Sequence, residues 1–362
     1  MRLYGHDPFK EYIKESEPYK RDKGYAWHTA IGLQAVDGLK TSEYLVRTAV
    51  RNIEGEITFE EANELLQSYY KENPARDASD RTEEADMVSA RIAALLSGQA
   101  FSFTPNEYLS IHRKLFTGIY SHTGQIRAYN ITKKEWVLDG ATVLYGSATE
   151  LRATLDYDFS EEKKFSYKKL SMNEIIHHLA FFVSRLWQIH VFGEGNTRTT
   201  AVFFIKYLRT LGFDVTNDIF DENAWYFRNS LVRVNYNDLK NGIHETTEYL
   251  EIFLRNRLLN ENHPLRNRTL HIRGAFSKPK KVNIGGEKAN IDDMFTAKTA
   301  SHIQKLKEEL GQEAIFGRSD VRSVLGLGAT RSSALLREMA EHGIIETVFG
   351  HGKGKYRFRQ QG

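Results

Sequence analysis

The residues best suited to chemistry lie in one short segment from His190 to Arg198, which reads His-Val-Phe-Gly-Glu-Gly-Asn-Thr-Arg. His190 is the only side chain of the segment that titrates near neutral pH, so it is suited to act as a general base on a hydroxyl group. Glu194 is the only acid, and its carboxylate is the kind of hard oxygen ligand that Mg²⁺ prefers. Gly193 and Gly195 allow the backbone to turn tightly and to come close to a ligand.

The same segment predicts a phosphate site. A loop that leads into a helix N-terminus presents unpaired N–H groups to an anion. Asn196 adds a side-chain donor, and Arg198 has the geometry to hold phosphate oxygens in a bidentate way. A base, a metal ligand, an anion hole and a cation within one loop are the parts that phosphoryl or nucleotidyl transfer needs.

Two apolar helices must position this segment. Apolar residues at helical spacing predict one helix over residues 173–189, and a second helix is expected to start near Asn196. Further upstream, residues 131–145 hold strand-forming residues around the turn signal Asp139-Gly140, which predicts a β-hairpin.

These residues resemble the Fic family of AMP-transferases, whose signature is His-x-Phe-x-(Asp/Glu)-Gly-Asn-Gly-Arg-x-x-Arg. The matching positions are His190, Phe192, Glu194, Gly195, Asn196 and Arg198. The stretch from Gly124 to Asn130 is similar to the one that leads into the family's β-hairpin flap, and the resemblance spans about residues 40–260. It implies a protein adenylyltransferase, which moves AMP from ATP onto a Ser, Thr or Tyr hydroxyl of a target protein or of itself.

The resemblance also implies a role for individual residues. His190 would deprotonate the target hydroxyl, which then attacks the α-phosphate of ATP, and Glu194 would hold the Mg²⁺ cofactor. The positions implied to bind ATP and its phosphates are Gly193, Glu194, Gly195, Asn196, Thr197, Arg198, Tyr226 and Asn235. The flap would dock the target as an added strand, through Ile131, Thr132, Lys133, Trp136 and Val137.

Two positions depart from the family's pattern. Thr197 stands where the family has Gly, and Ala201 stands where it has the second Arg. In the family that Arg is the partner of an inhibitory glutamate, and Glu54 followed by Gly55 resembles the inhibitory motif, with Val50 at its hydroxyl position. Because Ala201 offers no charge and no donor, we expect Glu54, the implied regulatory residue, to be a weak brake.

The C-terminal segment differs from the rest in composition. Residues 315–362 hold eight Lys and Arg against four acids, and their pattern resembles a winged helix–turn–helix. Residues 329–342 are expected to form the recognition helix, in which Arg331 and Ser332 reach a DNA major groove. Lys353 and Lys355, at the wing tip over residues 350–355, are expected to meet phosphates. Protein contact or dimerisation is the alternative use of such a domain.

Composition bounds the class of protein. The chain has 362 residues, a net charge of +3 and no cysteine, which excludes disulfides and thiolate metal sites. With no run of 18 apolar residues and no signal peptide, a membrane partner is not expected, and we expect a cytoplasmic protein.

The expected fold is mainly α. Residues 1–100 form an N-terminal helical region, 101–260 a Fic-like helical core with a β-hairpin flap, 261–300 a connection, and 301–362 the winged helix–turn–helix domain. Three alternatives remain: a DNA-binding regulator whose degenerate core senses nucleotides, a relative that removes AMP from proteins, and one that transfers another phosphate-containing group. The target, the modified residue type and formation of a homo-oligomer stay open.

Overall fold

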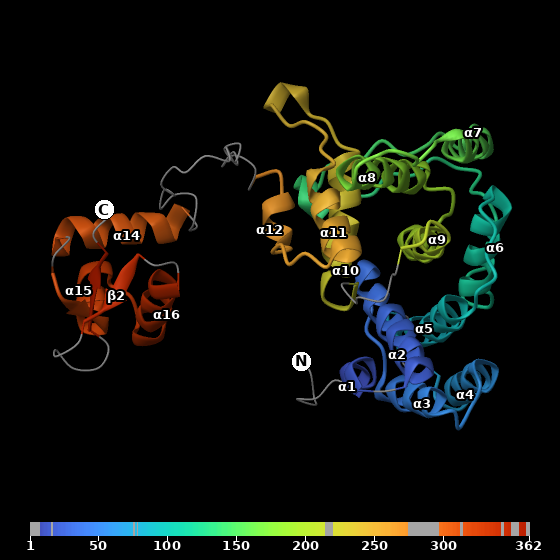
Figure 1. Ribbon diagram of the computed structural model, residues 1–362, viewed down its shortest axis with the longest axis horizontal. Coiled ribbons are helices and arrows are strands. Elements are labelled where there is room, and N and C mark those ends of the chain that lie inside the picture. The colour runs from blue at the N-terminus through green and yellow to red at the C-terminus, as the bar shows by residue number, and fades with distance from the viewer. Residues whose placement is uncertain are drawn as a thin grey trace. The chain divides into compact units, whose positions relative to one another are not determined.

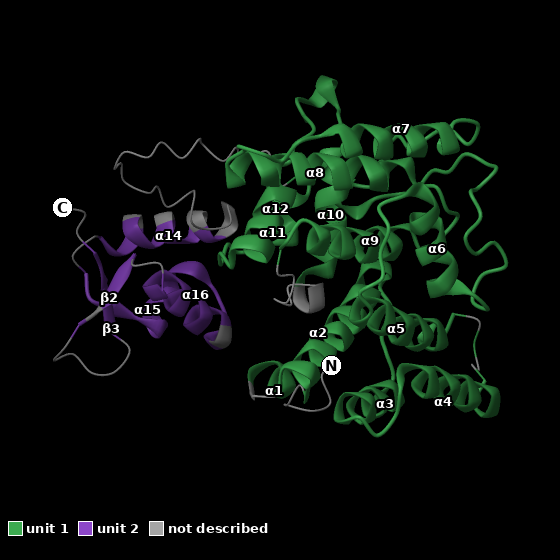
Figure 2. Ribbon diagram, turned by 45° about the vertical axis from the view of Figure 1, so that its right-hand side comes forward, with its two compact units in different colours: residues 1–277 green, residues 278–362 purple. Residues whose placement is uncertain are grey.

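The computed structural model describes residues 8–15, 17–74, 77, 79–213, 220–273, 297–311, 314–341, 344–348 and 355–359. The chain divides into two compact units, residues 1–277 and 278–362 (Figure 2). Both units are mainly helical, as the sequence predicts. Among the described helices, none is long and apolar enough to cross a membrane.

The first unit begins with helices that end at residues the sequence marks. Gly55 has φ 84 and ends α3, and Thr58 caps α4 in a reciprocal capping box with Glu61. α2 packs along α5, and α4 packs on α5 as well. These elements are α1 (Pro8–Glu15), α2 (Pro18–Gly32), the 3₁₀ helix η1 (Leu33–Asp37), α3 (Glu43–Glu54), α4 (Phe59–Glu72) and α5 (Thr82–Ser97).

A buried helix, α9 (Asn196–Thr210), lies among the helices of this unit. Residues 196–208 of α9 are all buried, and the helix contacts α5, α6, α8 and η1 (Figure 1). Its buried polar side chains are satisfied from outside the helix: Lys206 donates to two carbonyl oxygens near the end of α5, at 2.7 and 2.8 Å. The remaining helices of this unit are α6 (Pro105–Phe116), α7 (Leu151–Lys164), α8 (Met172–Ile189), α10 (Phe220–Val234), the 3₁₀ helix η3 (Leu239–Asn241), α11 (Glu248–Leu259) and α12 (Asn267–Leu270).

The expected β-hairpin is present as a loop without strands. Asp139 and Gly140 form its turn as predicted, both at positive φ, and Glu135 and Ala141 exchange one backbone hydrogen bond of 2.9 Å. No β-ladder follows along residues 131–145, and residues 136–138 form the 3₁₀ helix η2 (Trp136–Leu138). The prediction of strands was wrong because two strands alone are marginal, and here side chains and loops rather than a third strand hold the segment.

Residues 261–273 belong to the first unit. The sequence assigned them to a connection, yet they contain α12, whose Leu270 is fully buried in the main core. The backbone N–H of Ile272 donates to the carbonyl of Val137 at 2.9 Å, which ties α12 to the flap. Of the rest of the expected connection, residues 274–296 lie outside the described residues, and residues 297–300 form the start of α14.

The second unit has its own small core. Its elements are α14 (Ala297–Leu310), β1 (Phe316–Gly317), α15 (Arg318–Leu325), α16 (Ala329–Glu341), β2 (Ile345–Thr347) and β3 (Lys355–Phe358). The strands form an antiparallel sheet in the order β1-β3-β2, with Phe316 opposite Tyr356 and Ile345 opposite Phe358. The two helices and the strand pair that the sequence predicts are present. That this unit acts as a winged helix stays a prediction, since the expected tip with Lys353 lies outside the described residues.

Candidate active site

The end of α8 places His190. The residue caps the helix in the left-handed conformation, with φ 51, and its side chain is buried. Nδ1 donates to the carbonyl of Trp187 at 3.2 Å, which leaves Nε2 as the acceptor nitrogen, and Nε2 has no partner among the described residues. Burial, followed by the positive charge of Lys133, lowers the pKa of His190 well below its ordinary 6.5. The ring is therefore neutral at pH 7 with a free lone pair.

Arg127 fixes the backbone around His190. Its guanidinium donates to the carbonyls of His190 at 2.7 Å, Gly146 at 2.6 Å and Ile189 at 3.4 Å, and also to that of Tyr129. The stretch from Gly124 to Asn130 was identified from the sequence by its resemblance to the segment before the family's flap. That the Arg127 guanidinium binds these carbonyls was not predicted.

The loop after His190 is closed by Asn196. Its side chain accepts from the N–H of Phe192 at 3.0 Å and donates to the carbonyl of the same residue at 2.8 Å. Gly195 has φ 74, and a Cβ there would lie 2.4 Å from the Phe116 ring, so glycine is required. The backbone N–H groups of Gly193, Glu194 and Gly195 have no acceptor among the described residues. These N–H groups lie next to the start of α9, where the sequence predicts an anion hole.

Thr197, the first departure from the family's pattern, has a structural partner. Its hydroxyl accepts a hydrogen bond of 3.0 Å from the indole N–H of Trp187. Since Trp187 also accepts from His190, this bond ties the start of α9 to the turn that holds His190.

His112 on α6 contacts the loop through its ring and its Nε2. This residue was not identified from the sequence. Its Nδ1 accepts from the N–H of Gly124 at 2.8 Å, its Nε2 donates to the carbonyl of Glu194 at 3.0 Å, and its ring stacks on Phe192 with centroids 3.7 Å apart. Burial lowers its pKa to about 4. Its place on the apolar face of α6 was the one signal available in the sequence.

Arg198 does not face an open phosphate site. The side chain is fully buried: Nε lies 2.8 Å from Asp37 Oδ2, Nη1 donates to Gln34 at 3.0 Å, and Nη2 donates to Glu84 at 2.7 Å. Contact with a phosphate through Arg198 would require these partners to be given up. We call Asp37, Gln34 and Glu84 the Arg198 cage.

Glu84 is ionised in this cage. Burial raises its pKa, but hydrogen bonds from Arg81 and Tyr120 and the charge of Arg198 outweigh burial, so the pKa lies below its ordinary 4.5. The cage therefore holds a full positive charge against carboxylates within the protein.

Glu54 lies apart from Arg198. Its carboxylate accepts from Lys20 at 2.6 Å and from the hydroxyl of Tyr12, both in the first two helices. Ala201, at the place of the family's second Arg, is fully buried in α9. The structure therefore does not bring the predicted regulatory residue to the loop.

Glu194 is the one carboxylate that extends from the loop. Its side chain is half exposed, and Oε2 lies 3.6 Å from Nζ of Lys133 on the flap. Within the described ranges no three His, Cys, Asp or Glu side chains cluster as a metal site. A lone exposed carboxylate beside an anion hole fits Mg²⁺ that arrives with nucleotide phosphates, since Mg²⁺ commonly takes one or two carboxylates and completes its shell with phosphate and water.

The flap covers His190 and is anchored at its tip. Ile131 and Lys133 are half-buried and Thr132 is exposed, so this arm alternates as an extended chain does. Val137 is fully buried, while Trp136 is half exposed and meets His271 edge-on at 4.9 Å.

A buried group of side chains joins the flap to His190. Glu135 pairs with Arg228 at 2.7 Å and accepts from the hydroxyl of Tyr145 at 3.0 Å. The Tyr145 ring lies 4.4 Å from the His190 ring, between centroids. Sequence reasoning did not find Glu135 or Arg228.

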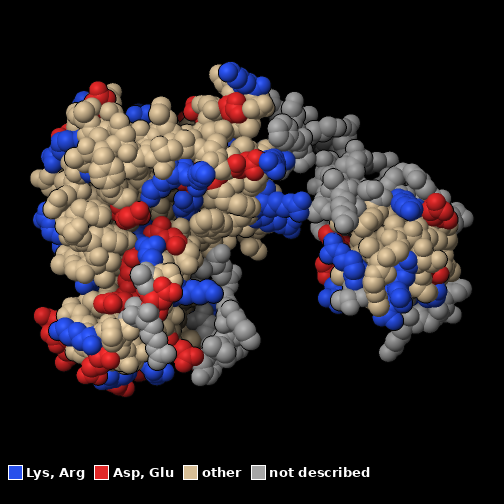
Figure 3. All heavy atoms as spheres, turned by 180° about the vertical axis from the view of Figure 1, so that it is seen from behind, with Lys and Arg blue, Asp and Glu red and all other residues tan. Residues whose placement is uncertain are grey.

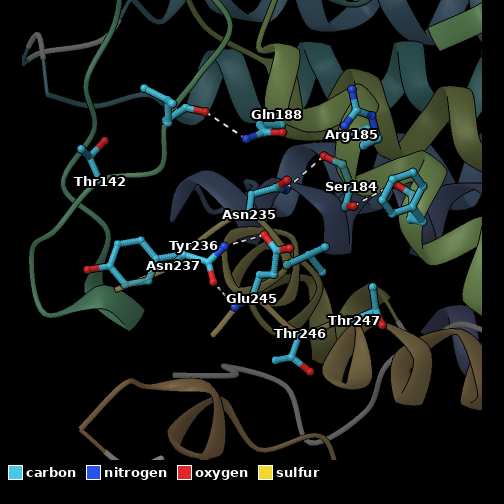
Figure 4. A pocket seen from close by; sticks show the side chains of 13 residues that line it. Thr142, Ser184, Arg185, Gln188, Asn235, Tyr236, Asn237, Glu245, Thr246 and Thr247 are labelled. Carbon is cyan, nitrogen blue, oxygen red and sulfur yellow. Dashed lines mark hydrogen bonds between the residues drawn. The ribbon is translucent and has the colours of Figure 1, made fainter. Parts of the chain in front are cut away.

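Asn235 and Tyr226, the two implied nucleotide contacts on and after α10, lie in different surroundings. Asn235 donates to the carbonyl of Ser184 at 3.1 Å and lines a cavity of about 710 Å³ together with Gln188 and the flap residue Leu144 (Figure 4). Tyr226 is buried and does not line this cavity. His190 and residues 191–198 do not line this cavity, and of the two implied nucleotide contacts only Asn235 does.

Comparison with known proteins agrees with the motif. The sequence model of the Fic/DOC family matches residues 102–208, which include the flap, His190 and the loop. A crystal structure of a Fic family protein from Desulfovibrio desulfuricans G20 is similar to 94% of this chain and 88% of that one, at 13% identity and a TM-score of 0.42. No curated protein matches. By the match of the family model alone, residues 102–208 form a Fic/DOC-family domain.

Proposed function

We propose that the protein is an adenylyltransferase that moves AMP from ATP to a hydroxyl side chain of a protein. The observation that carries the proposal is a neutral, buried His190 whose Nε2 is unpaired, directly before a loop with free N–H groups. A base and an anion hole in one turn suit a reaction in which a hydroxyl attacks a phosphate.

The chemical step balances with these groups. The hydroxyl oxygen of the target attacks the α-phosphorus of ATP, the bond from that phosphorus to the bridging oxygen breaks, and pyrophosphate leaves. The hydroxyl proton passes to Nε2 of His190. Lys133, Arg127 and Arg228 lower the pKa of His190 through their charge, so the same cations favour a polyanionic substrate nearby.

The cavity at Asn235 is the candidate site for the nucleoside end of ATP. The cavity at Asn235 has polar side chains from α8 and a flap wall at Thr142 and Leu144. A volume of about 710 Å³ lies within the range of ligand pockets. Glu194 would hold Mg²⁺, which would neutralise phosphate charge when it binds with the nucleotide.

Labelling with ATP that carries ³²P at the α or the γ position tests the proposal. Incubation with Mg²⁺ and cell lysate should transfer the α label and not the γ label to protein. His190→Ala should lower this transfer by about 10²–10⁴-fold, the usual cost of losing a general base, with ATP binding retained. His177→Ala is the control, because His177 lies on the same helix and its side chain is exposed.

Two results would count against adenylyl transfer: incorporation of the γ label, or an unchanged rate in His190→Ala. ATP binding without transfer of either label would instead favour the nucleotide-sensing alternative. The Arg198 cage and Ala201 favour that alternative, since neither leaves a motif arginine free for phosphate.

A further inference from the structure

The start of α16, which the sequence predicts to contact DNA, does not offer both of its expected side chains to a ligand. Ser332, which we expected to reach a DNA groove, is fully buried, and its hydroxyl donates to the carbonyl of Gly328 at 3.1 Å. The expectation was wrong because Ser332 faces the unit's own core. Arg331 beside it is exposed, but it does not line any described cavity.

A different face of the unit carries a basic groove of about 780 Å³. It runs between α15, α16 and β3. Its charged lining is four cations and one acid: Arg318, Arg322, Arg337, Lys355 and Glu341. Lys and Arg side chains also gather on the face of this unit seen in Figure 3.

The three arginines of this groove have no partner in the described chain. Arg318, Arg322 and Arg337 are exposed, and none forms an ion pair or side-chain hydrogen bond with a described residue. Lys355 differs, because its Nζ lies 3.4 Å from Asp320. Three unpaired guanidinium groups that line one concave surface favour an anionic ligand.

The neutral donors of the groove suit phosphate oxygens. Ser319, Ser333 and Tyr356 line it, and hydroxyl groups with arginines are the set that contacts nucleic-acid backbones. Arg318 and Ser319 also form the first turn of α15, where helix N–H groups have no acceptor within the helix.

We propose that this groove binds the phosphate backbone of duplex DNA. Guanidinium groups on two helices need more than one phosphate to pair with, and a duplex supplies a charge about every 1.7 Å along its axis. None of these side chains needs a base to pair with, so binding is independent of sequence. The inference does not rest on adenylyl transfer and concerns the second unit alone.

Fluorescence anisotropy of the full-length protein with a short DNA duplex of mixed sequence tests this. Arg322→Ala/Arg337→Ala should weaken binding on the order of 50-fold near 0.1 M salt and reduce the slope of log K against log salt by about 2, one for each lost phosphate contact. The matched control is Lys305→Ala/Arg359→Ala, which removes the same charge from exposed positions outside the groove. The control should change affinity by less than about threefold, since it removes no phosphate contact and lowers only the long-range electrostatic attraction, which salt screens.

Three results would overturn the proposal. They are no binding by the unaltered protein at about 50 mM salt, equal losses in the groove and control variants, and polyglutamate binding as tight as DNA at equal charge concentration. Thermal unfolding of each variant reports whether it folds. If the double variant unfolds early, Arg322→Ala alone should still lower the slope by about 1, and an unchanged slope would contradict the site.

Discussion

His190 donates its Nδ1–H to Trp187 and so keeps Nε2 as an acceptor in a buried position. The tautomer is set by the helix end, because the left-handed cap turns the ring back toward the carbonyl three residues before it. That His190 and the loop act together stays a prediction of the sequence, made because a histidine, two glycines and a basic residue at this spacing have few other uses. The sequence could not predict which nitrogen stays free.

Glu194 should control the metal dependence of labelling. Glu194→Ala removes the only carboxylate that extends from the loop, so ATP labelling should fall by at least tenfold and lose most of its response to added Mg²⁺. Titration of Mg²⁺ at fixed ATP measures this.

Lys133→Ala provides the contrast for Glu194. It removes the flap partner of Glu194, a surface ion pair worth about 0–1 kcal/mol, and leaves the metal response in place. If the unaltered protein labels in excess EDTA at the rate seen with Mg²⁺, then Glu194 does not act as a metal ligand in the reaction.

His112 should make the protein sensitive to mild acid. Its pKa is lowered to about 4 in the folded state, while an unfolded chain has about 6.5, so the unfolded state binds the proton first as pH falls. Stability is therefore full above pH 6.5 and declines toward pH 4, by up to roughly 3 kcal/mol from this group.

Urea unfolding of the unaltered protein and His112→Gln at pH 7 and pH 5 measures that loss. Gln retains a donor and an acceptor without the titration, so the variant should lose less stability between the two pH values. Equal losses in both proteins would show that other groups set the acid response.

Two N-terminal elements, η1 and α5, contact the first turn of α9 through the side chain of Arg198. The cage comes from η1 and α5, so α9 cannot present this guanidinium while those elements are in place. Glu54 on α3 takes no part in the cage.

Glu84→Gln should therefore affect labelling more than Glu54→Gly. The first variant weakens the hold on Arg198 and costs roughly 1.5–3 kcal/mol of stability, as a lost hydrogen bond to a charged group does. Its labelling should rise. Glu54→Gly should change labelling by less than about tenfold, or under roughly 1.4 kcal/mol on the barrier. Labelling rates and melting temperatures of both variants decide this, and a hundredfold activation by Glu54→Gly would show that Glu54 reaches the nucleotide site.

The flap illustrates the limit of local patterns. Its turn at Asp139-Gly140 follows from two residues that accept positive φ, and the sequence predicted it. Whether strands form on either side depends on what the flap packs against, and those neighbours, Arg228 and Ile272, come from α10 and the end of α12. Such distant contacts cannot be read from spacing.

The same reason applies to the whole molecule. Caps such as Thr58 and the helices around the loop were predictable because their signals lie within a few residues. The Arg198 cage joins positions 114 and 164 residues apart in the chain, and no local pattern reports such contacts. The family's pattern predicted Glu54 as the regulatory carboxylate, and it did not predict Gln34, Asp37 or Glu84 as partners of Arg198.

A protein that ends at residue 277 should label with ATP as well as the full chain, because the first compact unit ends there. One that ends at residue 260 loses α12, whose Leu270 is fully buried, so it should be less stable by at least about 1.5–3 kcal/mol. Thermal unfolding and labelling of both truncations test this. Loss of labelling in a well-folded 1–277 protein would mean that the second unit takes part in the reaction.

Arg127 binds the carbonyl of His190, the carbonyl of Tyr129 where the flap begins and that of Gly146 where it ends. One guanidinium thus joins the two ends of the flap to each other and to the backbone of His190. The two ends of the flap and the backbone of His190 therefore share one hydrogen-bonding side chain, so movement of the flap at either end would strain the bond to the carbonyl of His190. Exposed flap positions such as Thr132 take no part in these three bonds.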